Sequence, residues 1–200
     1  MNKLVLIEQM ERQIFTAQDL AVLWGYDDEQ KLYELIKYYV RKKQIFAIAR
    51  GLYATKPYSQ QDLRDDPKLL FAIANKLVPN SYISLFTVLK KCGVIFQYYD
   101  EIFSVAKRSA TRRVRGLNFV YKQIKSKILL SELGVEQENG VRIASLERAI
   151  ADIWYLYPRL NVDGLERVNM KKLRKIARLY EKKSMLKKIQ ELELELASRA

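Results

Sequence analysis

The residues with the clearest chemical potential in this sequence are basic, and they fall into two clusters. Residues 102–131 contain eight Lys and Arg and no acid, and Arg112, Arg113 and Arg115 crowd a stretch that we expect to be an exposed loop or strand end. Residues 167–188 contain ten Lys and Arg and a single acid. Guanidinium and ammonium groups bind phosphates, so the net charge of +13 indicates a polyanionic partner, either nucleic acid or an anionic membrane surface. A plain solvated face is the competing interpretation of the second cluster.

Catalytic side chains are scarce by comparison. The 200 residues include no histidine and one cysteine, Cys92. This composition excludes a Ser-His-Asp or Cys-His nucleophile, a His-ligated metal and a multi-thiolate zinc site. Carboxylate–metal chemistry needs two or three converging acids, and the basic middle of the chain supplies none. We therefore expect a protein that is not an enzyme and that uses no cofactor and no metal.

The membrane alternative is weakened by the distribution of apolar residues. Only Leu4 to Ile7 are apolar before Glu8, which is too short for the core of a signal peptide. No stretch approaches the roughly 18 apolar residues of a membrane-spanning helix. Because 49% of the residues are apolar, the chain can still bury a core. We expect a folded cytoplasmic protein with no membrane partner, so nucleic acid is the favoured polyanion.

The elements that must position this charge begin with three predicted helices. Apolar residues recur every three or four positions over residues 4–14, which predicts an amphipathic helix ending near Gln13. Thr16 is the expected N-cap of a second helix, which Gly25 ends. Acidic residues then open a third helix. Its apolar stripe is formed by Leu32, Leu35, Ile36, Tyr39 and Val40.

Two short β-prone segments follow directly, at residues 45–49 and 52–54, and the Arg50-Gly51 turn joins them. Helix, short helix, turn and helix is the order of a helix-turn-helix, and a hairpin directly after the third helix is typical of a wing. The sequence therefore predicts three parts. These are a winged helix-turn-helix domain over residues 1–56, a linker over 57–66 and a second domain over 67–200.

The apolar stripe leaves the other side of the third helix free to bind a partner. Lys, Arg and Tyr contact phosphates and base edges in a major groove, and Arg50 at the hairpin tip could reach the adjacent minor groove or backbone. Glu29 and Glu34 favour a protein partner instead, because carboxylates repel phosphates. We expect double-stranded DNA on this face, with three arginines of the first basic cluster extending it. The predicted DNA-binding residues are Lys31, Lys37, Tyr38, Arg41, Lys42, Arg50, Arg112, Arg113 and Arg115.

After the linker we expect a mixed α/β domain with a helical tail, which makes the whole chain α+β. Glu147, Arg148 and Asp152 fall on one predicted helix, and we interpret them as structural ion-pairing residues, with Glu147 pairing a base from another element. The predicted helices cover residues 69–77, 81–91 and 143–157, the predicted strands cover 94–97, 102–106 and 118–124, and a helix-prone tail follows Asp163.

Three sequence motifs occur in order: RGLYA at residues 50–54, IANKLVPNSYIS at 73–84 and IASLERAIAD at 143–152. They resemble the wing, a helix junction and a helix of AbiEi-family antitoxins, the transcriptional regulators of type IV toxin–antitoxin (abortive infection) systems. The resemblance spans about residues 3–160 and leaves the tail after Arg167 without a counterpart. It implies an N-terminal winged helix that represses its own operon, usually at inverted repeats. It also implies a C-terminal domain that counters a cognate nucleotidyltransferase-like toxin.

A regulator without a toxin partner and an RNA-binding protein stay open as alternatives. RNA binding would use the sheet together with the three clustered arginines, and Phe119 and Tyr121 would stack on bases, although aromatic residues in strands more often belong to the core. Residues 1–60 carry nine bases and seven acids, so most of the excess charge lies further along the chain. We therefore expect the C-terminal half to supply much of the electrostatic attraction.

Overall fold

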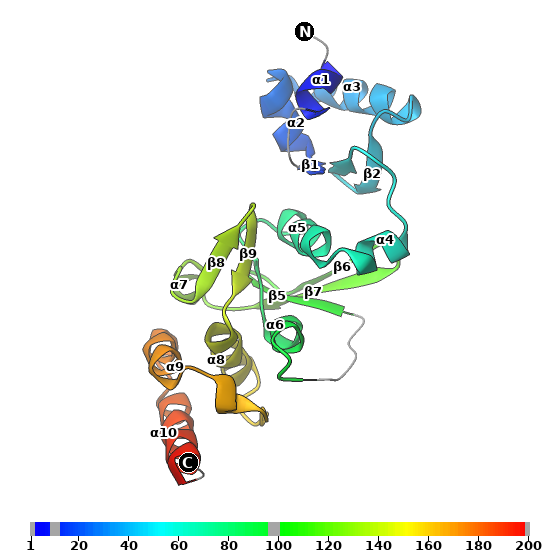
Figure 1. The fold of residues 1–200 in the computed structure, drawn as a ribbon. Coiled ribbons are helices and arrows are strands. Elements are labelled where there is room, and N and C mark those ends of the chain that lie inside the picture. Colours follow the sequence, from blue (N-terminus) through cyan, green and yellow to red (C-terminus); the bar gives the residue numbers. More distant parts are fainter. Residues whose placement is uncertain (1–2, 9–12, 96–100, 199–200) are drawn as a thin grey trace. The chain divides into compact units, whose positions relative to one another are not determined.

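The computed structural model describes residues 3–8, 13–95 and 101–198, and it shows an α+β protein, as predicted (Figure 1). The chain forms two compact units. The first, called here the N-terminal unit, comprises Met1–Leu77 and Arg113–Leu117. The second, the C-terminal unit, comprises Val78–Arg112 and Asn118–Ala200.

The N-terminal unit combines helices with a three-stranded antiparallel sheet of order β1-β3-β2. Ala54 of the central strand lies opposite Ile14 on one side and Phe46 on the other. The elements in chain order are α1 (Lys3–Glu8), β1 (Ile14–Thr16), α2 (Ala17–Trp24), α3 (Glu29–Arg41), β2 (Phe46–Ala49), β3 (Leu52–Ala54), α4 (Gln60–Asp65) and α5 (Pro67–Leu77). The end predicted near Gln13 for the first helix cannot be followed residue by residue, because residues 9–12 lie outside the described part.

Local sequence signals determine where α2 and α3 begin and where α2 ends. Thr16 and Asp19 form a capping box, in which each side chain accepts a hydrogen bond from the other residue's backbone N–H. Gly25, with φ 67°, ends α2 in the left-handed region. The Asp28 side chain caps α3 by accepting hydrogen bonds from the backbone amides of Gln30 and Lys31. The predicted cap at Thr16 and stop at Gly25 are confirmed.

One apolar core holds the helices of this unit together. Lys3 and Trp24 tie α1 to the end of α2, because each side chain donates to the other residue's carbonyl, at 2.6 and 3.1 Å. The apolar stripe predicted for α3 is confirmed, since its residues are buried or pack against the core. The buried members of this core are Ile7, Phe15, Ala17, Leu20, Trp24, Leu32, Ile36, Ile45 and Tyr53, and the stripe residues packed against them are Leu35, Tyr39 and Val40.

The C-terminal unit contains a mixed sheet of order β6-β7-β5-β4-β9-β8. β5 runs parallel to β7, and the short β4 pairs antiparallel with β5 and parallel with β9. The elements in chain order are β4 (Tyr82–Ile83), α6 (Leu85–Lys91), β5 (Glu101–Ala106), β6 (Ala110–Val114), β7 (Leu117–Gln123), α7 (Ser126–Leu129), β8 (Val135–Glu138), β9 (Val141–Ala144), α8 (Leu146–Leu156), η1 (Leu165–Arg167), α9 (Met170–Ala177), η2 (Arg178–Tyr180) and α10 (Lys183–Ser198).

The helix predicted over residues 81–91 is wrong in its first third. Tyr82 and Ile83 form a buried strand between β5 and β9, and the helix begins only at Leu85. The side chain of Ser84 points into the core, where it is fully buried. Pairing with strands distant in the sequence therefore overrides the local helical pattern.

The helix predicted over residues 143–157 is also too long at its start. Residues 141–144 are strand β9, and Ser145 caps α8 by accepting a hydrogen bond from the backbone N–H of Arg148. Val94 and Ile95, predicted as the start of a strand, lie outside the strands. The rest of that predicted strand, residues 96–97, lies outside the described residues.

The residues predicted as a linker, 57–66, contain a helix of their own. Ser59 and Asp62 form a second capping box at the start of α4. The division into compact units falls after Leu77 and assigns α4 and α5 to the N-terminal unit.

A buried ion pair with three hydroxyl partners lies at the centre of the C-terminal unit. Arg148 and Asp152 are both fully buried on α8, with Arg148 Nε 3.7 Å from Asp152 Oδ1. Asp152 accepts hydrogen bonds from the hydroxyls of Ser84 and Tyr180, each at 2.6 Å, and of Tyr82 at 3.1 Å. Tyr82 in turn accepts from Arg148 Nη2 at 2.8 Å. Complete burial raises the pKa of Asp152, and Arg148 with the three hydroxyl donors opposes that shift.

The remaining donors of Arg148 satisfy backbone carbonyls of the segment around α7. Nη2 donates to Ile128 O at 2.6 Å and Nη1 to Leu133 O at 2.8 Å. On the next residue of α8, Glu147 pairs with Lys172 of α9 at 3.1 Å. The structural interpretation of Glu147, Arg148 and Asp152 is therefore confirmed, including the partner of Glu147 from another element.

Replacing Arg148 should destabilise the C-terminal unit strongly. Arg148→Met leaves the carboxylate of Asp152 buried without a counter-charge, so we expect a loss of about 3–5 kcal/mol in unfolding free energy. The double variant Arg148→Met/Asp152→Leu should recover most of this loss, because it removes both buried charges. Urea unfolding in a Trp24→Phe background isolates the fluorescence of Trp154 on α8, since the chain has two tryptophans. Equal stability of the single and double variants would contradict the role of the ion pair.

Asp19 also links α2 to α5 within the N-terminal unit. Lys76 Nζ donates to Asp19 Oδ2 at 2.6 Å, and both side chains are mostly shielded from water. Burial alone would raise the pKa of Asp19, but hydrogen bonds from Lys76 and Thr16 outweigh it and lower that pKa below 3.8.

Asp19→Asn should therefore destabilise the N-terminal unit in a pH-dependent way. Because the pKa of Asp19 is lowered on folding, its stabilising effect is fully present above the unfolded pKa of about 3.9 and is lost as the pH falls through the folded pKa. We expect the unfolding free energy to fall by about 1 kcal/mol at pH 7, and we expect this difference to shrink as the pH is lowered below about 3.9. Urea unfolding in a Trp154→Phe background, followed by the fluorescence of Trp24, measures this difference in unfolding free energy. A difference that stays constant with pH would contradict the stabilising role of the ionised Asp19 side chain.

Candidate nucleic-acid interface

The outward side of α3 carries most of the predicted DNA-binding residues. α3 is amphipathic, and its buried side is fixed in the core by Leu32 and Ile36. The side chains on the opposite side project into solvent. The exposed residues predicted to bind DNA on this helix and its C-cap are Lys31, Lys37, Tyr38, Arg41 and Lys42.

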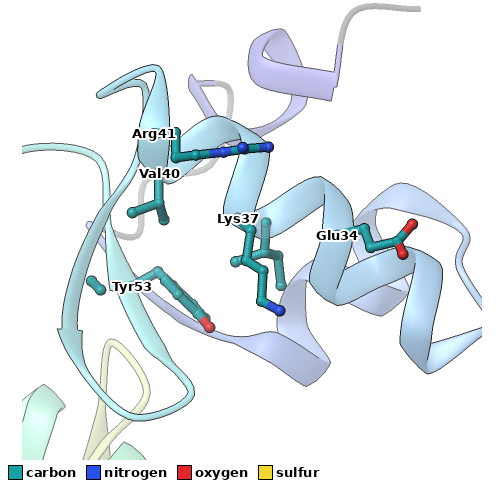
Figure 2. A pocket seen from close by; sticks show the side chains of 7 residues that line it. Glu34, Lys37, Val40, Arg41 and Tyr53 are labelled. Carbon is teal, nitrogen blue, oxygen red and sulfur yellow. The ribbon is translucent and has the colours of Figure 1, made fainter.

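A hollow of about 670 Å³ lies between α3 and the β2–β3 hairpin (Figure 2). Lys37 and Arg41 line it from α3, and Tyr53 of β3 lies opposite Lys37. Burial raises the pKa of Tyr53, so its hydroxyl stays protonated at neutral pH and can donate a hydrogen bond. Tyr53 was not among the predicted site residues, and alternation along the strand gives no signal for it, because Leu52, Tyr53 and Ala54 are all buried. The residues that line the hollow are Glu34, Ile36, Lys37, Val40, Arg41, Ala47 and Tyr53.

The charged groups on this face differ in how far they are already engaged. Lys31 lies 3.4 Å from Asp28, and Lys42 lies over the ring of Tyr38 at 5.9 Å. Within the described residues, neither Lys37 nor Arg41 forms an ion pair. These two cations can therefore bind an anion without first breaking a salt bridge.

The arginines predicted outside α3 are all exposed, and they are divided between the two units. Arg50 lies at the turn between β2 and β3. Arg113 and Arg115 belong to the N-terminal unit, and Arg115 Nη2 donates to the carbonyl of Ala47 on β2 at 3.0 Å. Arg112 belongs to the C-terminal unit. The N-terminal unit thus contains Arg50, Arg113 and Arg115 together with the α3 residues.

The basic stretch that carries these arginines forms an edge strand. β6 is the last strand of the sheet, and Thr111, Arg112 and Arg113 are consecutive exposed residues on it. Charged side chains on an edge strand also prevent pairing with other chains. Part of this basic cluster is therefore accounted for without any ligand.

The basic tail retains only part of its charge for a partner. Lys188 Nζ donates to Leu160 O at 2.9 Å and lies 5.0 Å from the ring centroid of Trp154. Other bases are in ion pairs: Lys172 with Glu147, Arg174 with Glu193, and Lys187 with Glu191. Three exposed bases have no ion pair among the described residues. Lys171 and Lys175 share one side of α9, and Arg178 follows as its C-cap.

The stacking residues proposed for RNA are not available to a base. Phe119 and Tyr121 lie on β7 and are 0% and 1% exposed. Their role in RNA stacking is therefore wrong, because both rings belong to the core of the C-terminal unit. This correction removes the specific observation that favoured RNA on the sheet.

Within the described residues, no group of three or more Cys, Asp or Glu is placed to hold a metal ion. The same residues include no helix that is both long enough and apolar enough to cross a membrane. Compared with models of known protein families and with curated proteins, the chain matches none.

Proposed function

We propose that this chain is a DNA-binding transcriptional regulator whose N-terminal unit is a winged helix-turn-helix. In this proposal α3 is the recognition helix, α2 precedes it across the turn at Gly25, and the β2–β3 hairpin is the wing. The order α1, β1, α2, α3, β2, β3 and the three-stranded antiparallel sheet support the assignment.

The observation that carries the proposal is the solvent-exposed cationic side of α3 beside an open hollow. Lys37 and Arg41 project there without ion-pair partners among the described residues, and the hairpin that carries Arg50 follows directly. A helix with such a face fits a major groove, where its Lys and Arg side chains contact phosphates and its other polar side chains contact the edges of the DNA bases. The partner is double-stranded operator DNA, and inverted repeats in that operator follow from the family resemblance.

The antitoxin part of the proposal is supported by the family resemblance. Two of the three motifs meet in one place, because Tyr82 and Ser84 come from the second motif and Arg148 and Asp152 from the third. The motif residues thus build the core of the C-terminal unit. We propose that this unit, on a scaffold of the antitoxin type, counters a nucleotidyltransferase-like toxin, and that the regulator represses its own operon.

Charge reversal on α3 should abolish operator binding without unfolding the protein. Lys37→Glu and Arg41→Glu change exposed side chains, so the melting temperature should stay the same, whereas affinity for the DNA upstream of the gene should fall at least about a hundredfold at physiological salt. Lys68→Glu, an exposed base on α5, is the matched control. Electrophoretic mobility shifts and a salt titration measure both effects.

The salt titration separates a specific contact from a general loss of charge. Each neutralised phosphate contributes about 0.9 to the slope of log affinity against log salt, so losing one contact should lower the slope by about one. If Lys37→Glu and Arg41→Glu bind like the wild type and like Lys68→Glu, α3 is not the DNA-binding face.

Rescue from the toxin should be separable from DNA binding. Co-expression with a nucleotidyltransferase-like reading frame beside the gene should restore growth, because the proposed neutralising part is the C-terminal unit. The Lys37→Glu/Arg41→Glu double variant should restore growth equally well while it loses repression of a reporter. Failure of the wild type to restore growth, with repression intact, would leave a regulator without a toxin partner.

A further inference from the structure

The exposed side of α3 is not uniformly basic, and its centre carries an acid. With about 100° of rotation per residue, Glu34 lies about 160° from both Leu32 and Ile36, directly opposite the buried stripe. Lys31 and Lys37 lie about 60° to either side of it. A helix placed in a groove with its buried side outward would direct Glu34 at the floor of the groove and these two lysines at its walls.

Arg41 shares this central line with Glu34. The two residues are seven positions apart, so they lie within about 20° of each other around the axis and about 10 Å apart along it. Both side chains are exposed and line the hollow beside the hairpin (Figure 2). Because base pairs are stacked about 3.4 Å apart, this separation corresponds to about three base-pair steps.

Among the residues that the structure describes, the carboxylate of Glu34 has no hydrogen-bond or ion-pair partner. Lys31 and Lys37 stand at the i−3 and i+3 positions, where an ion pair could form, yet among the described residues Lys31 pairs with Asp28 and Glu34 forms no salt bridge. An ionised carboxylate can only accept hydrogen bonds. Against a duplex it is repelled by phosphates unless it meets a donor.

The major groove offers few such donors. They are the exocyclic amino groups of cytosine and adenine, and adenine presents an acceptor, N7, beside its amino group. A carboxylate is therefore best matched by the N4 amino group of cytosine, whereas a guanidinium matches O6 and N7 of guanine.

We propose that Glu34 determines sequence specificity by accepting a hydrogen bond from the N4 amino group of a cytosine, while Arg41 donates to a guanine about three base pairs away in the same half-site. This inference rests on the proposed function, since it assigns base contacts within the same α3 face. In this inference the carboxylate of Glu34, which phosphates repel, contributes to sequence specificity instead of to affinity.

The test is selection of binding sites from a randomised duplex library by the full-length chain and its variants. The wild type should enrich sites with a fixed cytosine and a guanine about three steps away. Glu34→Gln is isosteric and exposed, so it should fold normally. Gln recognises adenine N6 and N7 in a bidentate manner. The variant should therefore prefer adenine over cytosine at that one position of the selected site by about tenfold to hundredfold. The preferences at the other positions should stay unchanged. Arg41→Lys, which keeps the charge but loses the fork of donors, should relax the guanine position.

Glu29→Gln is the matched control, because it removes a carboxylate from the first turn of the same helix on a line about 140° away from Glu34. It should select the same sites as the wild type. The inference is overturned if Glu34→Gln selects the wild-type sequence, or if it strengthens binding to all duplexes equally, which is simple repulsion. Those outcomes leave the proposed function intact as long as Lys37→Glu and Arg41→Glu still abolish binding. If the wild type enriches no sequence and binds no duplex, both proposals are wrong.

Discussion

A guanidinium and a carboxylate that solvent does not reach impose the strongest constraint on the C-terminal unit. Two buried charges are tolerated only when they face each other and all their hydrogen-bonding groups are used, and here that requires groups from β4, from the end of α7, from α8 and from η2. Tyr180 extends the constraint to the tail, because its hydroxyl reaches Asp152 only when α9 and η2 pack against α8. The position of the basic side of α9 is thus a consequence of satisfying a buried acid.

The residues that satisfy this constraint are different from the residues that are exposed to a partner. Arg148 and Glu147 are engaged with the core and with α9 and have nothing left to offer a ligand. The groups free to recognise a partner lie on exposed sides of helices, chiefly α3 in the N-terminal unit. A resemblance carried by core-building motifs therefore supports a shared scaffold more directly than a shared contact surface.

What could be predicted from the sequence follows the range of the interactions involved. The cap at Thr16, the stop at Gly25 and the buried side of α3 depend on residues within one or two helical turns, and all three were predicted correctly. The strand at Tyr82 and Ile83 depends on partners in β5 and β9, so no local pattern reveals it. For the candidate site, the periodicity of α3 gives its exposed side chains. Tyr53 and the hollow escape prediction because the hairpin folds back beside the helix.

The modest net charge of residues 1–60 bears on how this part of the chain would recognise a duplex. Non-specific binding to a duplex grows with the number of phosphates neutralised, so a reading helix lined only with lysines and arginines would bind every sequence. Residues 1–60 hold nine bases against seven acids, and one of those acids lies at the centre of the α3 face. Under the proposed function, such a face would be attracted weakly to an arbitrary duplex and strongly only where donors in the groove meet its carboxylate. For a transcriptional regulator the ratio of specific to non-specific affinity matters more than either affinity alone. If α3 is the recognition helix, as proposed, its acid would raise that ratio by weakening non-specific binding.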